Sequence, residues 1–155
     1  MKQIRTFFRT GMIFILSLVI LFPSSVSAAS SSPQITREYL SDGSYFETVI
    51  SSTNARSSIK NASKTTTYKN ADGDSLWYVK VTANFDFNGS TSKCTAASAS
   101  AGSYTKVWKI LDKRASRSGN SGSATALAGS YMGGLFVGSV TKTITLSCDK
   151  NGSLT

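Results

Sequence analysis

Apolar and polar side chains alternate strictly along residues 77–87. The apolar positions are Trp77, Val79, Val81, Ala83, Phe85 and Phe87, and the positions between them include Lys80, Thr82 and Asn84. A period of two residues over this length predicts a β-strand with one face on the core and one in water.

A second strand precedes it, because residues 63–70 (SKTTTYKN) are rich in Thr and Tyr, which suit a pleated surface. Asp72-Gly73 lies between the two segments and favours a tight two-residue hairpin turn. That turn would place Tyr68 opposite Trp77 and Thr66 opposite Val79.

The same turn contains the acid-rich stretch NADGDS (residues 70–75), which invites comparison with a calcium loop. An EF-hand loop needs Gly at position 6 and a bidentate Glu at position 12. Counted from Asn70, those positions hold Ser75 and Val81, and a strand follows instead of a helix. We interpret the stretch as a turn and expect no metal site there.

Further strands are indicated at residues 45–50, at 104–113, and on both sides of Gly133-Gly134, a second hairpin corner. After that corner Val140, Ile144, Leu146 and Cys148 alternate inward, and Lys142 interrupts them, which predicts an edge strand or a bulge. Residues 53–62 are expected to form a short helix. The chain as a whole is predicted to be an all-β, single-domain antiparallel sandwich or barrel. Cys94, Trp108 and Cys148 follow each other as in an immunoglobulin domain, but Leu146 replaces the expected Tyr, so that topology is left open.

The first residues have the three-part pattern of a secretory signal peptide. Lys2, Arg5 and Arg9 are basic, residues 11–22 are apolar except for Ser17, and small residues precede a cut after Ala28. The apolar run is shorter than the ~20 residues that a membrane-spanning helix needs. We therefore expect residues 1–28 to be removed, 29–35 to be a disordered linker and 36–155 to be an exported β-domain with no stable transmembrane segment.

Cys94 and Cys148 are the only cysteines. An even number of cysteines in an oxidising compartment predicts one disulfide between them.

The charge of the expected mature chain is moderately positive. Removal of Lys2, Arg5 and Arg9 leaves 14 of the 17 cations against 8 acids, a net of +6. Such a charge favours contact with polyanions without choosing one. The candidate binding segment is residues 106–117, where basic side chains surround an aromatic one, and its residues are Lys106, Trp108, Lys109, Lys113, Arg114 and Arg117. The alternative is a solvated strand whose lysines oppose aggregation.

A second candidate is the apolar, glycine-rich stretch GSYMGGLFVGSV (residues 129–140). It could enter a membrane as a hairpin, but we favour a hairpin buried in the sheet, because a lone hairpin exposes unpaired edges to lipid.

Three stretches resemble a group of small, uncharacterised secreted proteins of Gram-positive gut bacteria of the clostridial kind. They are GSYFETVI, SKTTTYKNADGDSLWYVKVTANFDFNGSTSKCTAAS and VTKTITLSCDKNGSLT, which together with the residues between them span nearly all of the expected mature chain. The resemblance implies a bacterial exported protein and supports the disulfide, and it brings no catalytic residue with it.

The chain contains no His, which removes the usual nucleophile–histidine arrangements and histidine-bound zinc. No spacing proposes a pair of catalytic carboxylates, and no phosphate-binding loop is present. We therefore expect a secreted, non-catalytic binding module without metal or cofactor, with an anionic envelope polymer or a glycan as candidate partner, and we do not expect nucleic acid. The alternative is a membrane-active, bacteriocin-like effector.

Overall fold

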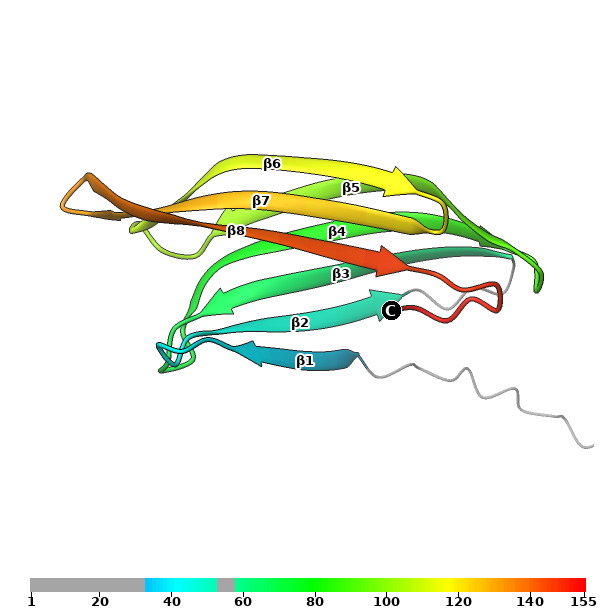
Figure 1. The fold of residues 1–155 in the computed structure, drawn as a ribbon, viewed down its shortest axis with the longest axis horizontal. Coiled ribbons are helices and arrows are strands. Elements are labelled where there is room, and N and C mark those ends of the chain that lie inside the picture. Colours follow the sequence, from blue (N-terminus) through cyan, green and yellow to red (C-terminus); the bar gives the residue numbers. More distant parts are fainter. Residues whose placement is uncertain (1–32, 53–57) are drawn as a thin grey trace, which may run out of the picture.

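The computed structural model describes residues 33–52 and 58–155, and every regular element in them is a β-strand (Figure 1). The strands are β1 (Gln34–Tyr39), β2 (Tyr45–Ser52), β3 (Ile59–Lys69), β4 (Ser75–Phe87), β5 (Ser92–Ser103), β6 (Trp108–Ser118), β7 (Ser121–Met132) and β8 (Leu135–Ser147). The predicted all-β class is confirmed.

The strands form two antiparallel sheets, one with the order β1-β2-β3-β4-β5 and one with the order β6-β7-β8. Within each sheet every strand pairs with its neighbours in the sequence, so both sheets are simple meanders. An immunoglobulin domain would require Greek-key connections instead.

The β3–β4 hairpin has the register that the sequence predicts, with Tyr68 opposite Trp77 and Thr66 opposite Val79. The turn lies one residue earlier in the chain than predicted, because it spans residues 70–73. The Gly73 N–H donates to the Asn70 carbonyl over 3.0 Å. Gly73 has a positive φ of 90°, and within residues 33–52 and 58–155 only glycines have a positive φ. The loop is therefore a type I turn followed by a left-handed glycine, which spares Asp72 a strained conformation. This turn shifts the strand pairing only between Tyr68 and Lys69. The pairing of the core residues before that point is therefore the predicted one.

The core lies between the two sheets. The inward face of β4 supplies its largest part, with Trp77, Val79, Val81, Ala83 and Phe85 at most 1% exposed. Each large side chain buried in this way stabilises the fold by about 1.5–3 kcal/mol. Phe87, also predicted to be buried, is only half-buried, and Lys80 is not fully exposed.

Small residues of β7 let the second sheet approach β4 closely. Ala124, Ala126 and Ala128 are fully buried. At Gly122 the approach is closest, because a Cβ atom there would lie 3.0 Å from the Ala83 Cβ and 3.3 Å from the Cys94 Sγ. The alanines and this glycine therefore set the spacing between the sheets, which holds the β7–β8 hairpin in a fixed direction.

Strand β8 is an edge strand, as the position of Lys142 predicts. The bulge in its pairing lies elsewhere, at Ser130/Tyr131 of β7. The Lys64 ammonium donates to the Thr145 carbonyl over 2.9 Å and ties β8 to the larger sheet.

The predicted boundaries are tested only in part. The signal peptide (residues 1–28) and residues 29–32 of the linker lie outside the described residues, and β1 already begins at Gln34, inside the predicted linker. The predicted helix over residues 53–62 lies partly outside them, and residues 59–62 belong to β3 instead, where they pair with β4.

Candidate functional site

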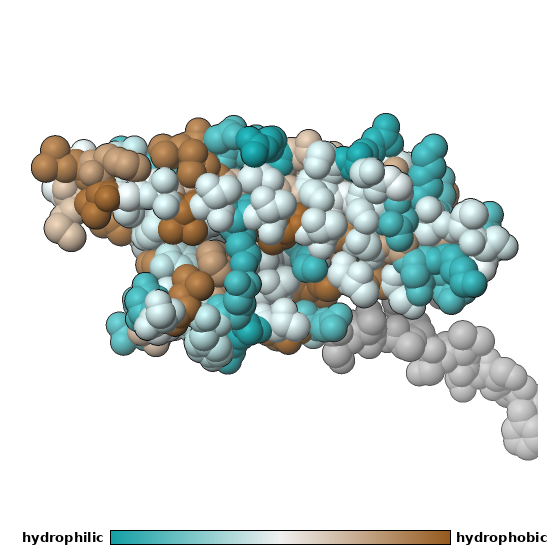
Figure 2. Space-filling view, in the orientation of Figure 1, coloured by the Kyte–Doolittle hydropathy of each residue, from teal (hydrophilic) through white to brown (hydrophobic). Residues whose placement is uncertain are grey.

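The turn between β7 and β8 carries a group of exposed apolar side chains, which we call the apolar tip. Its residues are Met132 (73% exposed), Leu135 (76%), Phe136 (56%) and Val137 (62%). The turn reaches beyond the ends of the neighbouring strands (Figure 1), and hydrophobic atoms gather at that end of the molecule (Figure 2). Our preferred interpretation of this stretch, a hairpin buried in the sheet, is wrong for the tip, because the hairpin extends past the strands that would cover it.

Two glycines form the corner of the tip, as predicted. Gly133 and Gly134 have φ of 57° and 87°, and Met132 pairs with Leu135 on either side of them. Two positive φ values are typical of the tight turn that follows the twist of a hairpin. The corner therefore adds no polar side chain to the apolar residues next to it.

Aromatic and basic side chains lie behind the tip. The rings of Tyr131 and Phe136 are 5.7 Å apart, and the Lys109 ammonium lies 4.7 Å from the centre of the Tyr131 ring. Leu111 and Phe136 both lie against Gly129, where an added Cβ would be 2.9 Å from the Leu111 Cδ1 and 3.2 Å from the Phe136 Cε2. The apolar surface therefore continues from β8 across β7 to β6.

The β5–β6 connection lies beside this surface, because the Tyr131 N–H donates to the Val107 carbonyl over 2.7 Å. Val107 is 50% exposed, and Lys106 before it is also exposed. Lys109 therefore lies behind the apolar tip, over Tyr131, and Lys106 is exposed on the connection beside it.

The basic segment predicted from the sequence is not gathered on one surface. A register shift between Ile110 and Asp112 inserts one residue into β6. After it Lys113 pairs with buried Ala126, whereas Arg114 pairs with Thr125 on the opposite face.

The other residues of that segment follow the same division. Arg117 shares the face of Lys113 and donates to the Thr95 carbonyl, while Lys109 points to the outer face over Tyr131. Trp108 packs in the core, with its ring 5.6 Å from Tyr68 and 6.2 Å from Trp77. Of these cations Lys109 lies against the apolar surface, and Lys106 is exposed on the adjoining β5–β6 connection.

Cys94 and Cys148 are both buried, and both are free thiols, so the predicted disulfide is not found. Their backbones lie beside the same β6–β7 turn, because the Cys94 N–H donates to Gly119 and the Cys148 N–H to Asn120. Each thiol has a separate partner instead of the other, the Ala96 carbonyl for Cys94 and the Asp149 carbonyl for Cys148. Burial raises the pKa of both thiols.

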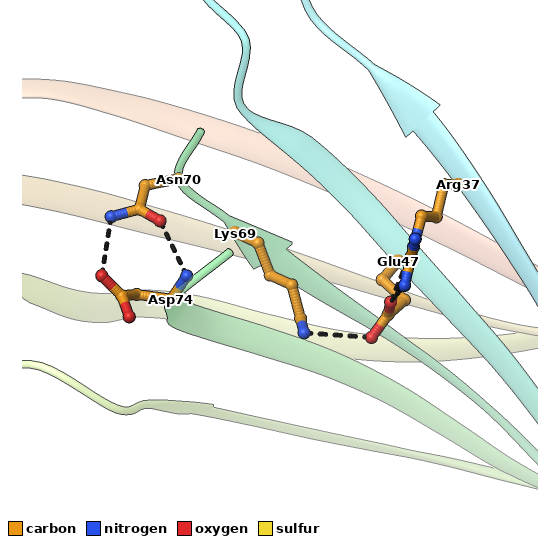
Figure 3. A network of polar contacts seen from close by, with 5 residues as sticks. All are labelled: Arg37, Glu47, Lys69, Asn70 and Asp74. Carbon is orange, nitrogen blue, oxygen red and sulfur yellow. Dashed lines mark hydrogen bonds and ion pairs between the residues drawn. The ribbon is translucent and has the colours of Figure 1, made fainter. Parts of the chain in front are cut away.

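The acid-rich stretch at residues 70–75 is a turn stabilised by its own side chains (Figure 3). The Asn70 amide donates to the Asp74 carboxylate over 3.1 Å, and its carbonyl oxygen accepts the Asp74 N–H over 2.7 Å. Among the described residues no group of three or more acidic or cysteine side chains could hold a metal ion.

Several other carboxylates have structural partners. Glu47 is paired with Arg37 and Lys69 (Figure 3), and Glu38 with Lys142. Serine donors lower the pKa of two more carboxyl groups: the hydroxyl and N–H of Ser44 act on Asp42, and the Ser153 N–H acts on Asp149.

The sequence identified the stretch that contains the apolar tip but not that the tip is exposed. A signal for this stretch was its lack of charge: residues 121–141 contain no charged side chain, although neighbouring β6 carries several. None of the described segments forms a helix with the length and hydropathy that crossing a bilayer requires. No protein family, curated protein or solved structure matches this chain.

Proposed function

We propose that the protein is an exported, non-catalytic β-sandwich that binds a surface outside the cell through the apolar tip. One observation carries the proposal: apolar side chains at the corner of a projecting hairpin are more than half exposed. Exposed apolar residues that occur singly need no explanation, but a contiguous apolar patch is typical of an interaction site.

The fold itself does not require an apolar tip. The core contacts of β7 end at Ala128, and Leu135 is 76% exposed, so its side chain adds little to folding. A polar side chain at position 135 would serve the turn equally well. Apolar residues at this position are explained by a partner that covers them.

The positions of the acidic side chains support binding over catalysis. Glu47 pairs with Arg37 of the larger sheet and Glu38 with Lys142 of the smaller one, and Asp42 and Asp149 accept bonds within their own turns. None of these contacts places two carboxylates across a common cleft, as glycoside hydrolysis would require.

The alternative function, a membrane-active and bacteriocin-like effector, would use the same tip. A single hairpin that crossed the bilayer would expose unpaired backbone groups along both strands to lipid, at several kcal/mol for each group. Shallow contact avoids that cost, so we favour binding over permeabilisation. Release of dye from vesicles at low protein concentration would favour the effector instead.

A polyanion partner held by the basic segment has less support. Such a site needs its cations on one surface, and β6 divides them between its two faces. We therefore propose the apolar tip as the main contact surface.

Adsorption to intact Gram-positive cells tests the proposal. The wild-type chain and the double variant Leu135→Ser/Phe136→Ser are mixed with cells, and the protein that sediments with the cells is measured. We expect the double variant to remain in solution while keeping the urea unfolding midpoint of the wild type. Equal sedimentation of the two proteins, or none of either, would contradict the proposal.

A further inference from the structure

We infer that the surface bound by the apolar tip is an anionic lipid bilayer, into whose interface the tip inserts while Lys106 and Lys109 contact the headgroups. This inference rests on the proposed function and names its partner.

The first argument is the arrangement of the side chains around the corner. Leu135 and Phe136 are neighbours on one strand, so their side chains point to opposite faces of the hairpin. Phe136 lies on the outer face beside Leu111 and Gly129, whereas Leu135 is 76% exposed next to it. A rigid protein partner would have to close around both faces, whereas a bilayer surrounds an inserted tip on every side.

The second argument is shape. The tip projects as a narrow end beyond the strands beside it (Figure 1), and its hydrophobic atoms form a convex surface (Figure 2). A docking site for a peptide or small molecule is usually concave. A convex apolar end fits a soft interface that deforms around it.

The third argument is the charge on the part of the chain that carries the tip. Residues 104–147 hold six cations and one acid, Asp112, whereas residues 33–103 hold seven cations and six acids. The acids of the turns at the same end, Asp42, Asp72 and Asp74, belong to the larger sheet, and the tip reaches beyond those turns (Figure 1). Lys106 and Lys109 are the cations of this part that lie nearest the tip, whereas Arg117 lies beside the β6–β7 turn at the other end of β6. Cations directly behind the tip favour anionic headgroups.

The fourth argument is the order of side chains along the axis of insertion. Met132 and Leu135 are outermost, and the Tyr131–Phe136 ring pair and the Lys109 ammonium over Tyr131 follow behind them. Tyrosine rings and lysines are enriched where a protein passes from hydrocarbon to headgroups. The sequence of apolar, aromatic and basic groups matches the layers of one leaflet.

Flotation with lipid vesicles tests the inference on the expected mature chain, residues 29–155. One set of vesicles is phosphatidylcholine, and the other is an equimolar mixture of phosphatidylcholine and phosphatidylglycerol. We expect binding to the anionic vesicles that weakens as salt is raised, since screening shortens to ~8 Å at physiological ionic strength. The variant Leu135→Ser/Phe136→Ser should bind them at least about tenfold more weakly, because it loses two apolar side chains that the bilayer would bury.

Two further variants separate the contribution of the lysines to vesicle binding from that of the apolar side chains. Lys106→Gln/Lys109→Gln should weaken binding to anionic vesicles about fivefold for each lysine and leave binding to neutral vesicles unchanged. Ile35→Ser is the matched control, because Ile35 is 57% exposed on β1, away from the tip, and its replacement should leave binding unchanged. The apolar run at residues 11–22 would itself bind vesicles, so the wild type and all variants are compared without residues 1–28, as expected after export.

The outcomes distinguish this inference from the proposed function. Tip-dependent adsorption to cells without tip-dependent binding to vesicles would overturn the lipid partner and leave the binding module. Tip-dependent dimers in light scattering, without vesicle binding, would identify a second copy as the partner instead. If the double variant matches the wild type on both cells and vesicles, the inference and the proposed function both fail.

Discussion

The Lys142 ammonium lies 4.0 Å from the centre of the Phe46 ring. It also reaches the Glu38 carboxylate over 2.7 Å, and the Lys142 side chain is only 20% exposed. A cation on the inward side of edge strand β8 is thus stabilised by a ring of β2 and an acid of β1. These contacts fasten the free edge of the smaller sheet to the larger one.

Replacement of Lys142 should loosen that attachment. We expect Lys142→Ala to lower the free energy of unfolding by about 1–2 kcal/mol, because the cation–π contact and the packing of the side chain are lost. Glu38→Gln should cost less than about 1 kcal/mol, since Glu38 is 66% exposed and solvent screens its ion pair. Urea unfolding of both variants gives the comparison. An equal loss from both would show that the ion pair, and not the ring, holds the lysine.

The two faces of β4 should differ sharply in their tolerance of charge. Val81 is fully buried and Thr82 is exposed. Val81→Asp should destabilise the fold by about 3 kcal/mol or more, because it places an unpaired charge in the core. Thr82→Asp should change stability by less than about 1 kcal/mol. Similar thermal unfolding midpoints for the two variants would contradict the assigned faces.

The strands and hairpins that depend on residues close together in the chain were predicted well from the sequence. The alternation from Trp77 to Phe85 and a glycine at the corner are local signals, and together they determine the pairing of Tyr68 with Trp77. The class of the fold follows from several such hairpins joined end to end.

Features that depend on how the two sheets meet could not be predicted in this way. The residue inserted into β6 at Leu111 reverses the faces of the lysines and arginines after it, and nothing in the spacing of those residues announces it. The apolar tip is exposed only because β7 and β8 extend past the strands that would cover them (Figure 1). The two cysteines similarly lie beside the same turn without being bonded to each other, and their even number does not reveal this.

Burial should make both thiols slow to react. The pKa of Cys94 and of Cys148 is raised by burial, so less of the reactive thiolate is present at neutral pH. We expect a thiol reagent such as Ellman's reagent to label neither residue quickly in the folded protein and both in urea. The intact mass without reductant is the control. A mass lower by two hydrogen atoms, with no labelling in urea, would show a disulfide and contradict the free thiols.

Two glycines should differ in how well they tolerate replacement by alanine. Gly73 has a φ of 90°, so Gly73→Ala should destabilise the β3–β4 turn by about 1 kcal/mol. Gly138 does not have a positive φ, and an added Cβ would meet nothing nearer than the Ser130 hydroxyl at 4.0 Å. Gly138→Ala should therefore stay within about 0.5 kcal/mol of the wild type in chemical unfolding. A larger loss at position 138 than at position 73 would contradict these backbone conformations.

The ion pairs of Glu47 should give stability a dependence on acid pH. Hydrogen bonds from Arg37 and then Lys69 lower the pKa of the Glu47 carboxyl group below its ordinary 4.5, and its side chain is only 17% exposed (Figure 3). A carboxyl group whose pKa is lower in the folded state stabilises fully above its ordinary pKa, and this contribution is lost as the pH falls through the folded value. We expect Glu47→Gln to cost about 1 kcal/mol at pH 7, and the difference from the wild type to shrink as the pH drops below 4.5. Asp112→Asn is the matched control, because the Asp112–Arg114 pair is 3.5 Å long and well exposed, so little change is expected at pH 7. Urea unfolding across this range measures both differences, and a Glu47→Gln effect that persisted unchanged in acid would show that the ion pairs are not its cause.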